Sequence, residues 1–283
     1  MKKDVVLLDG ASGTAMWQAA EKRGIDKTPV WKYNIEHPEL TLQIAKEYVD
    51  AGSQVIQTNT FGANGPAVRR SSEYSVREVV RAGVKIAKEA VQGTETKVAL
   101  AAGPLSVLLE PYGDLTAEEA AALYEEQLGA GMEEQPDGII LETFMDLEMM
   151  RVAATVAKQY GLPVFCMMTF EKSGKTMMGN SVQDIVDTLE PVGIDGIGMN
   201  CSLGPDLALP VIRDFSEKTS LPLMFKPNAG LPVKAEDGTM ISPYDAQTFA
   251  KDVAPALEFV GYLGCCCGSD AEYIRTLKEM YFL

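Results

Sequence analysis

Short apolar runs recur along the chain, and each is followed by a polar or glycine-containing turn and then by a segment with helical spacing. The eight runs are Val5–Asp9, Gln54–Thr58, Lys97–Ala102, Gly138–Leu141, Val164–Met168, Gly196–Met199, Leu223–Lys226 and Phe259–Leu263. Short apolar runs bounded by turn residues are typical of buried strands in parallel sheets. Their alternation with helices predicts an α/β fold.

The segments between these runs carry helix signals. Thr116 is followed three residues later by Glu119, which is the spacing of a capping box at the start of a helix. Apolar residues recur at helical intervals from Leu147 to Tyr160, and Gly161 supplies a stop. Ser181 is placed to cap the helix that follows the fifth run. Helices therefore separate successive strands, as parallel pairing requires.

The chain of 283 residues shows no Gly/Ser-rich linker, no low-complexity segment and no repeat of fixed period beyond this alternation. It therefore predicts one (β/α)8 barrel spanning residues 1–283 as a single domain. Two doubly wound domains are the alternative. The barrel is favoured because every run ends in a polar or glycine-containing cluster, and barrels build active sites from the loops at the carboxyl ends of their strands. The functional residues should then share one face.

The charge of the chain narrows the range of partners. The formal net charge is −15, and no Lys/Arg cluster stands out for binding the nucleic-acid backbone. The apolar run after Met1–Asp4 is too short for a signal peptide, and no stretch reaches transmembrane length. We therefore expect a cytoplasmic protein that binds neither nucleic acid nor membrane. Because disulfides rarely persist in the cytoplasm, clustered cysteines indicate metal binding or catalysis.

The cysteines are the candidate chemistry. Cys265–Cys267 lie between Gly264 and Gly268 at the end of the eighth run, and Cys201 follows the sixth run. In a barrel these two strand ends lie close across the rim, with one strand between them. Zn²⁺ takes thiolate ligands in tetrahedral geometry, and catalytic sites keep one position open. Cys201 and two of the three adjacent cysteines therefore predict a zinc site with an open position, where the flanking glycines let the backbone turn sharply.

Packing and redox chemistry are the alternative roles for the cysteines. Cys166 lies inside the fifth run and fits a small buried core residue. Three adjacent cysteines between two glycines are hard to explain in the same way. A reactive dithiol usually has the C-x-x-C spacing at a helix start, which this sequence lacks.

An open position on thiolate-bound zinc can bind a substrate thiol and keep it as a thiolate at neutral pH. Alkyl transfer to sulfur is then the natural reaction. Asp9 and Glu142 stand at the ends of the first and fourth runs and could hold an ammonium group. Backbone N–H groups around Thr60 and Phe61 could meet a carboxylate. A solvated loop residue or a helix cap is the alternative for each acid, but together these groups suit a small amino-acid thiol.

Eight stretches in one order carry a family resemblance: Asp9–Thr14, Asn34 with His37–Glu39, Thr58–Phe61, Gly103–Pro104, Glu142–Phe144, Gly198–Cys201, Pro227–Pro232 and Gly264–Gly268. In these stretches the chain resembles the zinc-dependent homocysteine S-methyltransferases, in particular the homocysteine-binding barrel of cobalamin-dependent methionine synthase. The stretches span nearly the whole chain. The resemblance therefore implies a (β/α)8 barrel and zinc-dependent methyl transfer to homocysteine.

The resemblance also implies a ligand set for the metal. Cys201, Cys266 and Cys267 correspond to the zinc ligands. The family pattern reads Gly-Gly-Cys-Cys-Gly, whereas Cys265 stands here in place of the second glycine, so the ligands are assigned by counting back from the last glycine of the cluster. Asn228 resembles a residue near the metal that fills the open position before the substrate arrives.

The resemblance further implies how the amino acid is held. Asp9 and Glu142 correspond to the groups that bind the amino end of homocysteine, and Gly10 is counted with them. The backbone at Thr60 and Phe61 corresponds to the region near the carboxylate of the substrate.

The sequence thus predicts a zinc-dependent methyltransferase that converts homocysteine to methionine. Pro227–Pro232 resembles the methionine synthase version, so the implied donor is a corrinoid protein that carries methylcobalamin as a separate partner. A free-standing enzyme that uses S-methylmethionine or betaine is the alternative. A zinc-stabilised thiol-binding module without catalysis is a second alternative.

Two further features have expected roles outside the chemistry. The loop 171–180 contains Gly174 and Gly179 and is either a mobile lid or a plain connection. His37 is the only histidine and precedes a predicted helix, so it is expected to be a cap or loop residue. A Ser-His-Asp system would need another histidine.

Overall fold

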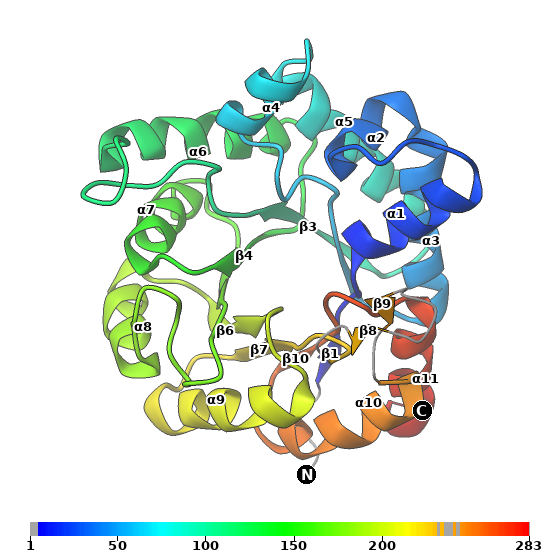
Figure 1. Cartoon of the computed structure of the whole chain (residues 1–283), viewed down its shortest axis with the longest axis vertical. Coiled ribbons are helices and arrows are strands. Elements are labelled where there is room, and N and C mark those ends of the chain that lie inside the picture. The colour runs from blue at the N-terminus through cyan, green and yellow to red at the C-terminus, as the bar shows by residue number, and fades with distance from the viewer. Residues whose placement is uncertain (1–4, 231–232, 235–239, 242–243, 283) are drawn as a thin grey trace.

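The computed structural model describes residues 5–230, 233–234, 240–241 and 244–282. Within them, eight parallel strands form a barrel that is surrounded by a ring of helices (Figure 1). The barrel strands are β1 Val6–Leu7, β2 Val55–Gln57, β3 Lys97–Ala102, β4 Gly138–Phe144, β5 Val164–Met168, β6 Gly196–Asn200, β7 Leu223–Lys226 and β10 Tyr262–Leu263. Each strand falls on one of the predicted runs, and the order β1-β10-β7-β6-β5-β4-β3-β2 follows the chain around the barrel. The predicted single (β/α)8 barrel is confirmed.

The strands β1 and β2 close the ring. Leu8 forms a parallel bridge with Val55. The backbone N–H of Gln54 donates to the carbonyl of Leu7 at 2.7 Å, and the side-chain Oε1 of Gln54 accepts from the backbone N–H of Leu7 at 2.8 Å. Because the ring is closed, the carboxyl ends of all eight strands form one continuous rim.

A short hairpin lies between β7 and α10. Its strands, β8 Val233–Lys234 and β9 Met240–Ile241, pair in antiparallel fashion. Leu231 and Pro232, the last residues of the stretch that resembles methionine synthase, lie outside the described residues.

Eleven α-helices lie in the described part of the chain. They are α1 Ser12–Lys22, α2 Tyr33–Glu36, α3 Pro38–Ala51, α4 Gly65–Ser71, α5 Val76–Ala90, α6 Ala117–Met132, α7 Leu147–Lys158, α8 Val182–Leu189, α9 Pro205–Lys218, α10 Ala246–Val253 and α11 Ala271–Tyr281. Three short 3₁₀ helices cover Val30–Lys32, Glu190–Val192 and Ala254–Glu258. Across these described helices, none is both long enough and apolar enough to span a lipid bilayer.

The predicted helix signals appear in the structure. Thr116 and Glu119 form a complete capping box at the start of α6, and Ser181 caps α8 in the same way. The helix α7 ends at Lys158, slightly before the predicted Tyr160, and Gly161 adopts a positive φ of 70°. Local hydrogen bonding of these side chains therefore fixes where the helices begin.

The barrel core has two layers. Inside the barrel lies a small cluster of buried apolar side chains: Leu8, Ala99, Ile140, Met167 and Met224. A larger apolar layer lies between the sheet and the surrounding helices, and Cys166 belongs to it with 0% exposure, as predicted. Burial of this layer is the main force that stabilises the scaffold.

Gly198 marks the tightest contact between β6 and β7. A Cβ at this position would lie 1.8 Å from the carbonyl oxygen of Met224, which is backbone and cannot move aside. We therefore expect Gly198→Ala to lower the free energy of unfolding by roughly 3 kcal/mol or more, as overpacking does in rigid cores. Denaturant unfolding measures the change. Gly13→Ala is the control, because a Cβ there meets no heavy atom within 4 Å, and it should not lower the stability.

Candidate metal centre and substrate pocket

Three cysteines meet at the carboxyl-end rim. Cys201 directly follows β6, and Cys266 and Cys267 follow β10, with β7 between the two strands. Their three sulfur atoms all lie within 4.8 Å of one another, and the Sγ atoms of Cys201 and Cys267 are 3.5 Å apart. This spacing and this donor set fit a single tetrahedral Zn²⁺ ion.

Cys265 is set apart from this cluster. Its side chain is fully buried in the apolar layer outside the barrel, and its backbone N–H donates to the carbonyl of Asp9 at 3.2 Å. Burial raises the pKa of the Cys265 thiol well above its ordinary value. The geometry therefore groups the same three cysteines that the sequence assigned, while their role as ligands stays a prediction.

The end of β7 holds both cysteine turns in place. The backbone N–H of Cys201 donates to the carbonyl of Lys226 at 3.0 Å, and that of Cys266 donates to the carbonyl of Pro227 at 2.8 Å. Cys201 and Ser202 have positive φ angles of 58° and 54°, a costly conformation for residues with side chains. The backbone thus directs the thiols toward one point by its own hydrogen bonds.

The two glycines that flank the cysteines are required for different structural reasons. A Cβ on Gly264 would lie 2.7 Å from the carbonyl oxygen of Asp9, so the close approach of β10 to β1 requires a glycine. Gly268 has a positive φ of 85°, which glycine adopts at little cost. The predicted backbone freedom is therefore seen at Gly268, whereas Gly264 is needed because a side chain would not fit against Asp9.

A pocket of about 260 Å³ opens beside the three cysteines. Its wall also contains Gly10, Phe61 and Glu142, three of the residues predicted to bind substrate. The remaining lining residues come mostly from the β1–α1 turn and from the end of β2: Ala11, Ser12, Gly13, Thr14, Trp17, Val30, Gln57, Thr58, Asn59, Thr143 and Lys226. The volume suits a small amino acid whose side chain points at the thiols.

Gly10 leaves no room for a side chain on the pocket wall. A Cβ on Gly10 would lie 2.8 Å from Tyr48 Oη and 3.0 Å from Ser269 Oγ. The absence of a side chain therefore lets Tyr48 pack directly under the β1–α1 turn.

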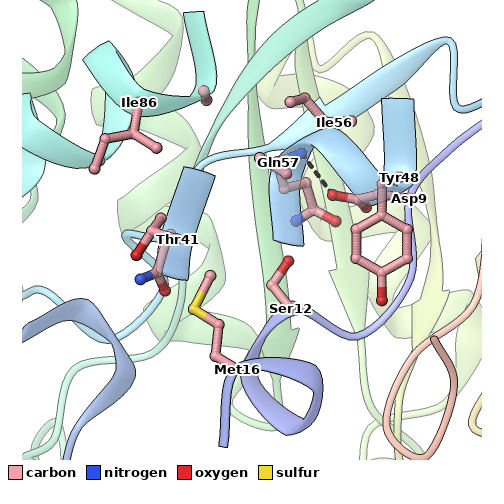
Figure 2. A pocket seen from close by; sticks show the side chains of 12 residues that line it. Asp9, Ser12, Met16, Thr41, Tyr48, Ile56, Gln57 and Ile86 are labelled. Atoms are coloured by element: carbon pink, nitrogen blue, oxygen red, sulfur yellow. Dashed lines mark hydrogen bonds between the residues drawn. The ribbon is translucent and has the colours of Figure 1, made fainter. Parts of the chain in front are cut away.

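Asp9 lies behind the pocket wall rather than on it. It is 1% exposed, its Oδ1 accepts from Lys226 Nζ at 2.7 Å, and its Oδ2 accepts from the backbone N–H of Gln57 at 2.7 Å. Figure 2 shows the hydrogen bond from Gln57 and the ring of Tyr48 beside Asp9, around a cavity of about 10 Å³. Any effect of Asp9 on a bound ammonium group must therefore act past the side chain of Lys226.

Lys226 is a site residue that the sequence reasoning missed. It lines the pocket, is 2% exposed, and also donates to Gln57 Oε1. Burial would lower the pKa of this lysine, but the charges of Asp9 and Glu142 outweigh burial and hold its pKa above the usual value. A lysine that ends an otherwise apolar strand was the available signal.

Asn200 is the second missed residue. It is fully buried and joins β6 to the end of β4: its Oδ1 accepts from the backbone N–H of Thr143 at 2.8 Å, and its Nδ2 donates to Thr143 Oγ1 at 2.8 Å. The same Nδ2 lies 3.3 Å from Glu142 Oε2 and 3.8 Å from Cys266 Sγ. Asn200 therefore links the acid of the pocket to the cysteine cluster.

Glu142 faces the pocket at the end of β4. Burial raises the pKa of its carboxyl, while the nearby ammonium of Lys226 opposes that rise. The next residue, Thr143, has a positive φ of 65°, which the bonds from Asn200 help to hold. Glu142 is thus a positioned carboxylate on the wall of the pocket.

The structure separates the two residues predicted near the substrate carboxylate. Phe61 lines the pocket and is 37% exposed. Thr60 is fully buried and lies off the wall, because its backbone N–H donates to the carbonyl of Thr58 at 2.9 Å and its hydroxyl donates to the carbonyl of Ala101 at 2.6 Å. Its predicted carboxylate contact stays a prediction, and the loop geometry favours Phe61 for that contact.

Asn228 is 5% exposed and follows β7 next to the cysteine turns. Its backbone N–H donates to the carbonyl of Leu203 at 2.9 Å. Its side-chain Oδ1 is buried and has no hydrogen-bond partner among the described residues. A buried oxygen without a donor is costly, and this orphaned atom fits the predicted role as an oxygen ligand near the metal.

The remaining predictions concern His37 and the loop 171–180. His37 occupies the N-cap position of α3, as predicted, although its side chain makes no capping hydrogen bond. Its Nδ1 lies 3.6 Å from Glu39, and its ring packs edge-on against Tyr33. The loop is held by hydrogen bonds from the backbone N–H of Glu171 to Lys175 and of Thr176 to Asn180, and its role as a lid stays a prediction.

The fold and the site together define a (β/α)8-barrel protein with a three-cysteine centre beside an amino-acid-sized pocket. The model of the homocysteine S-methyltransferase family matches residues 6–281. The chain therefore belongs to the homocysteine S-methyltransferase family.

Two curated relatives match nearly the whole chain. The chain is 27% identical over 294 residues to a methionine synthase of Mycobacterium leprae, covering 96% of this chain. It is likewise 27% identical over 300 residues to a methionine synthase of Mycobacterium tuberculosis, covering 98% of this chain. The match spans 24% of the length of each of these relatives.

Among solved structures, the metallated form of the homocysteine methyltransferase MmuM from Escherichia coli matches with a TM-score of 0.79 and 23% identity, covering 98% of this chain and 96% of that chain. The apo form of the same protein matches with a TM-score of 0.75. At this level of identity the likeness supports the barrel fold.

Proposed function

We propose that this protein binds Zn²⁺ through Cys201, Cys266 and Cys267 and transfers a methyl group to the sulfur of homocysteine, which gives methionine. One observation carries the proposal: in a chain of this family, three sulfur atoms within 4.8 Å of one another border a pocket of about 260 Å³.

The donor set fits zinc. Three thiolates would occupy three tetrahedral positions. Asn228, whose buried Oδ1 has no hydrogen-bond partner among the described residues, is the proposed fourth ligand when no substrate is bound. When bound, zinc supplies a site that keeps a substrate thiol ionised at neutral pH.

The side chains of the chain itself orient the amino acid. Glu142 offers a carboxylate to the substrate ammonium, and Asn200 holds that carboxylate in place. The turn at Phe61 and the β1–α1 turn supply backbone N–H groups near the substrate carboxylate. The thiol proton passes to solvent when the thiolate forms. A new S–CH₃ bond then forms from a sulfur electron pair as the donor–CH₃ bond breaks, the donor leaves with the electron pair of that bond, and positioning supplies most of the rate.

We further propose a methylated corrinoid protein, carrying methylcobalamin, as the donor. Two observations support it: the curated relatives that the chain matches are methionine synthases, and apolar side chains stand exposed on the loops that follow β3 and β5. Tyr112 is 69% exposed, Met177 63% and Leu108 53%. Exposed apolar residues beside an active-site rim fit a protein partner that delivers the methyl group there.

A donor comparison tests the proposal. Purified protein should carry one equivalent of zinc, and a zinc chelator should abolish methyl transfer to homocysteine. Methylcobalamin, S-methylmethionine and betaine should then be offered side by side, and we expect turnover with methylcobalamin. Turnover with only the two small donors would reject the corrinoid donor and keep the methyltransferase. Zinc-loaded protein that transfers methyl from none of the three, and whose metal spectrum ignores homocysteine, would support a structural zinc module instead.

A further inference from the structure

Negatively charged side chains outnumber positively charged ones at one end of the pocket. Apart from the cysteines, Glu142 and Lys226 are its only charged side chains among the described lining residues, and Asp9 lies directly behind Lys226. Two carboxylates and one ammonium group therefore share this end of the pocket. With all three groups ionised, the protein presents a net charge of one negative unit there.

Lys226 is fixed in this arrangement. Its ion pair with Asp9 is 2.7 Å long, and the two side chains are 2% and 1% exposed. The side chain of Lys226 packs against Gly264, since a Cβ on that glycine would lie 3.2 Å from Lys226 Cγ. Its backbone pairs with Asn200 of β6. Separating a buried ion pair leaves an uncompensated charge, which is strongly unfavourable. Lys226 therefore stays on Asp9 when a ligand enters.

We propose that Lys226 is a specificity-determining residue: by neutralising Asp9, it sets the net charge of the thiol that the pocket accepts. This inference rests on the proposed function, because homocysteine is the thiol concerned. Homocysteine brings one ammonium group and one carboxylate. One net negative unit can hold the ammonium without repelling the carboxylate strongly, whereas two negative units would favour a thiol that carries only a positive charge.

Three thiols that carry different charged groups probe this inference. Homocysteine is the zwitterion, γ-mercaptobutyrate lacks the ammonium group, and γ-mercaptopropylamine lacks the carboxylate. Calorimetric titration of the zinc-loaded protein gives a Kd for each. The quantity of interest is the Kd of γ-mercaptobutyrate divided by the Kd of γ-mercaptopropylamine, because a loss of stability or of zinc would change both values alike.

Four variants form a charge series. Lys226→Met should raise the ratio by about tenfold or more, and Asp9→Asn should lower it by a similar factor, since a unit charge a few ångströms away in a partly buried site has an effect of this size. The double variant D9N/K226M restores the net charge and should return the ratio to within about threefold of the wild-type value. Lys226→Arg keeps the charge and is the matched control.

The outcomes separate the two proposals. Folded Lys226→Met protein that binds homocysteine with an unchanged ratio would overturn the role of Lys226 and leave the proposed function standing. If Lys226→Met does not fold, an unchanged ratio in Asp9→Asn overturns the role in the same way, and a lowered ratio that the double variant restores supports it. Zinc-loaded wild-type protein that binds no homocysteine would reject the proposed function, and the inference with it.

Discussion

Cys267→Ser should leave the protein folded but without bound zinc, and methyl transfer should fall on the order of a thousandfold. Cys267 sits on the pocket wall with its sulfur 3.5 Å from that of Cys201, so it contributes to the cluster and little to the apolar core. A serine hydroxyl does not ionise at neutral pH and is a poor ligand for zinc beside two thiolates. The substrate thiol would then lose the ion that keeps it ionised.

Metal analysis and a methyl-transfer assay measure the two effects. Cys265→Ser is the matched control, because it makes the same change two positions earlier in the chain. Cys265 is fully buried outside the three-sulfur cluster. That variant should keep one equivalent of zinc while losing roughly 1–3 kcal/mol of stability from the buried hydroxyl. The assignment of ligands would be refuted by the reverse pattern, in which Cys265→Ser loses the zinc and Cys267→Ser keeps it.

The sequence was informative wherever function and fold depend on local patterns. Each strand was visible because a parallel strand in a barrel is buried on both faces and reads as a short apolar run. The grouping of the cysteines could be predicted because the carboxyl ends of β6 and β10 must share one rim, whatever the details of packing. Cys265 was set apart only by the resemblance, in which the ligands are counted back from Gly268.

The pairings across the barrel could not be predicted in this way. Lys226 and Asp9 are 217 positions apart, and both end apolar strands, so each one alone looks like a polar residue of a strand-end loop. Only the register of β1, β10 and β7 brings the two charges together. The same applies to Asn200, whose bonds reach a strand end 57 positions earlier. Thr60 and Phe61 are adjacent, yet the turn after β2 buries one and exposes the other.

Because Asp9 is held by Lys226, Glu142 is the carboxylate that remains free to meet the substrate ammonium. We therefore expect Glu142→Gln to raise the Kd of homocysteine by about a hundredfold, since removing one partner of a buried charge pair is strongly unfavourable. Zinc content should not change, because the cysteines remain and glutamine can still accept the hydrogen bond from Asn200. The effect on methyl transfer should appear in KM more than in kcat.

Binding measurements on the zinc-loaded protein separate this charge effect from a general loss of the pocket. The Kd of γ-mercaptobutyrate, which lacks the ammonium group, should not rise in Glu142→Gln, because no attraction is lost and one repulsive charge is removed. Glu148→Gln on the outside of α7 makes the same substitution at an exposed position and should leave both values unchanged. If Glu142→Gln raises the Kd of both thiols equally, the carboxylate shapes the pocket and does not recognise the amino group. Loss of affinity confined to homocysteine would assign recognition of the amino group to Glu142.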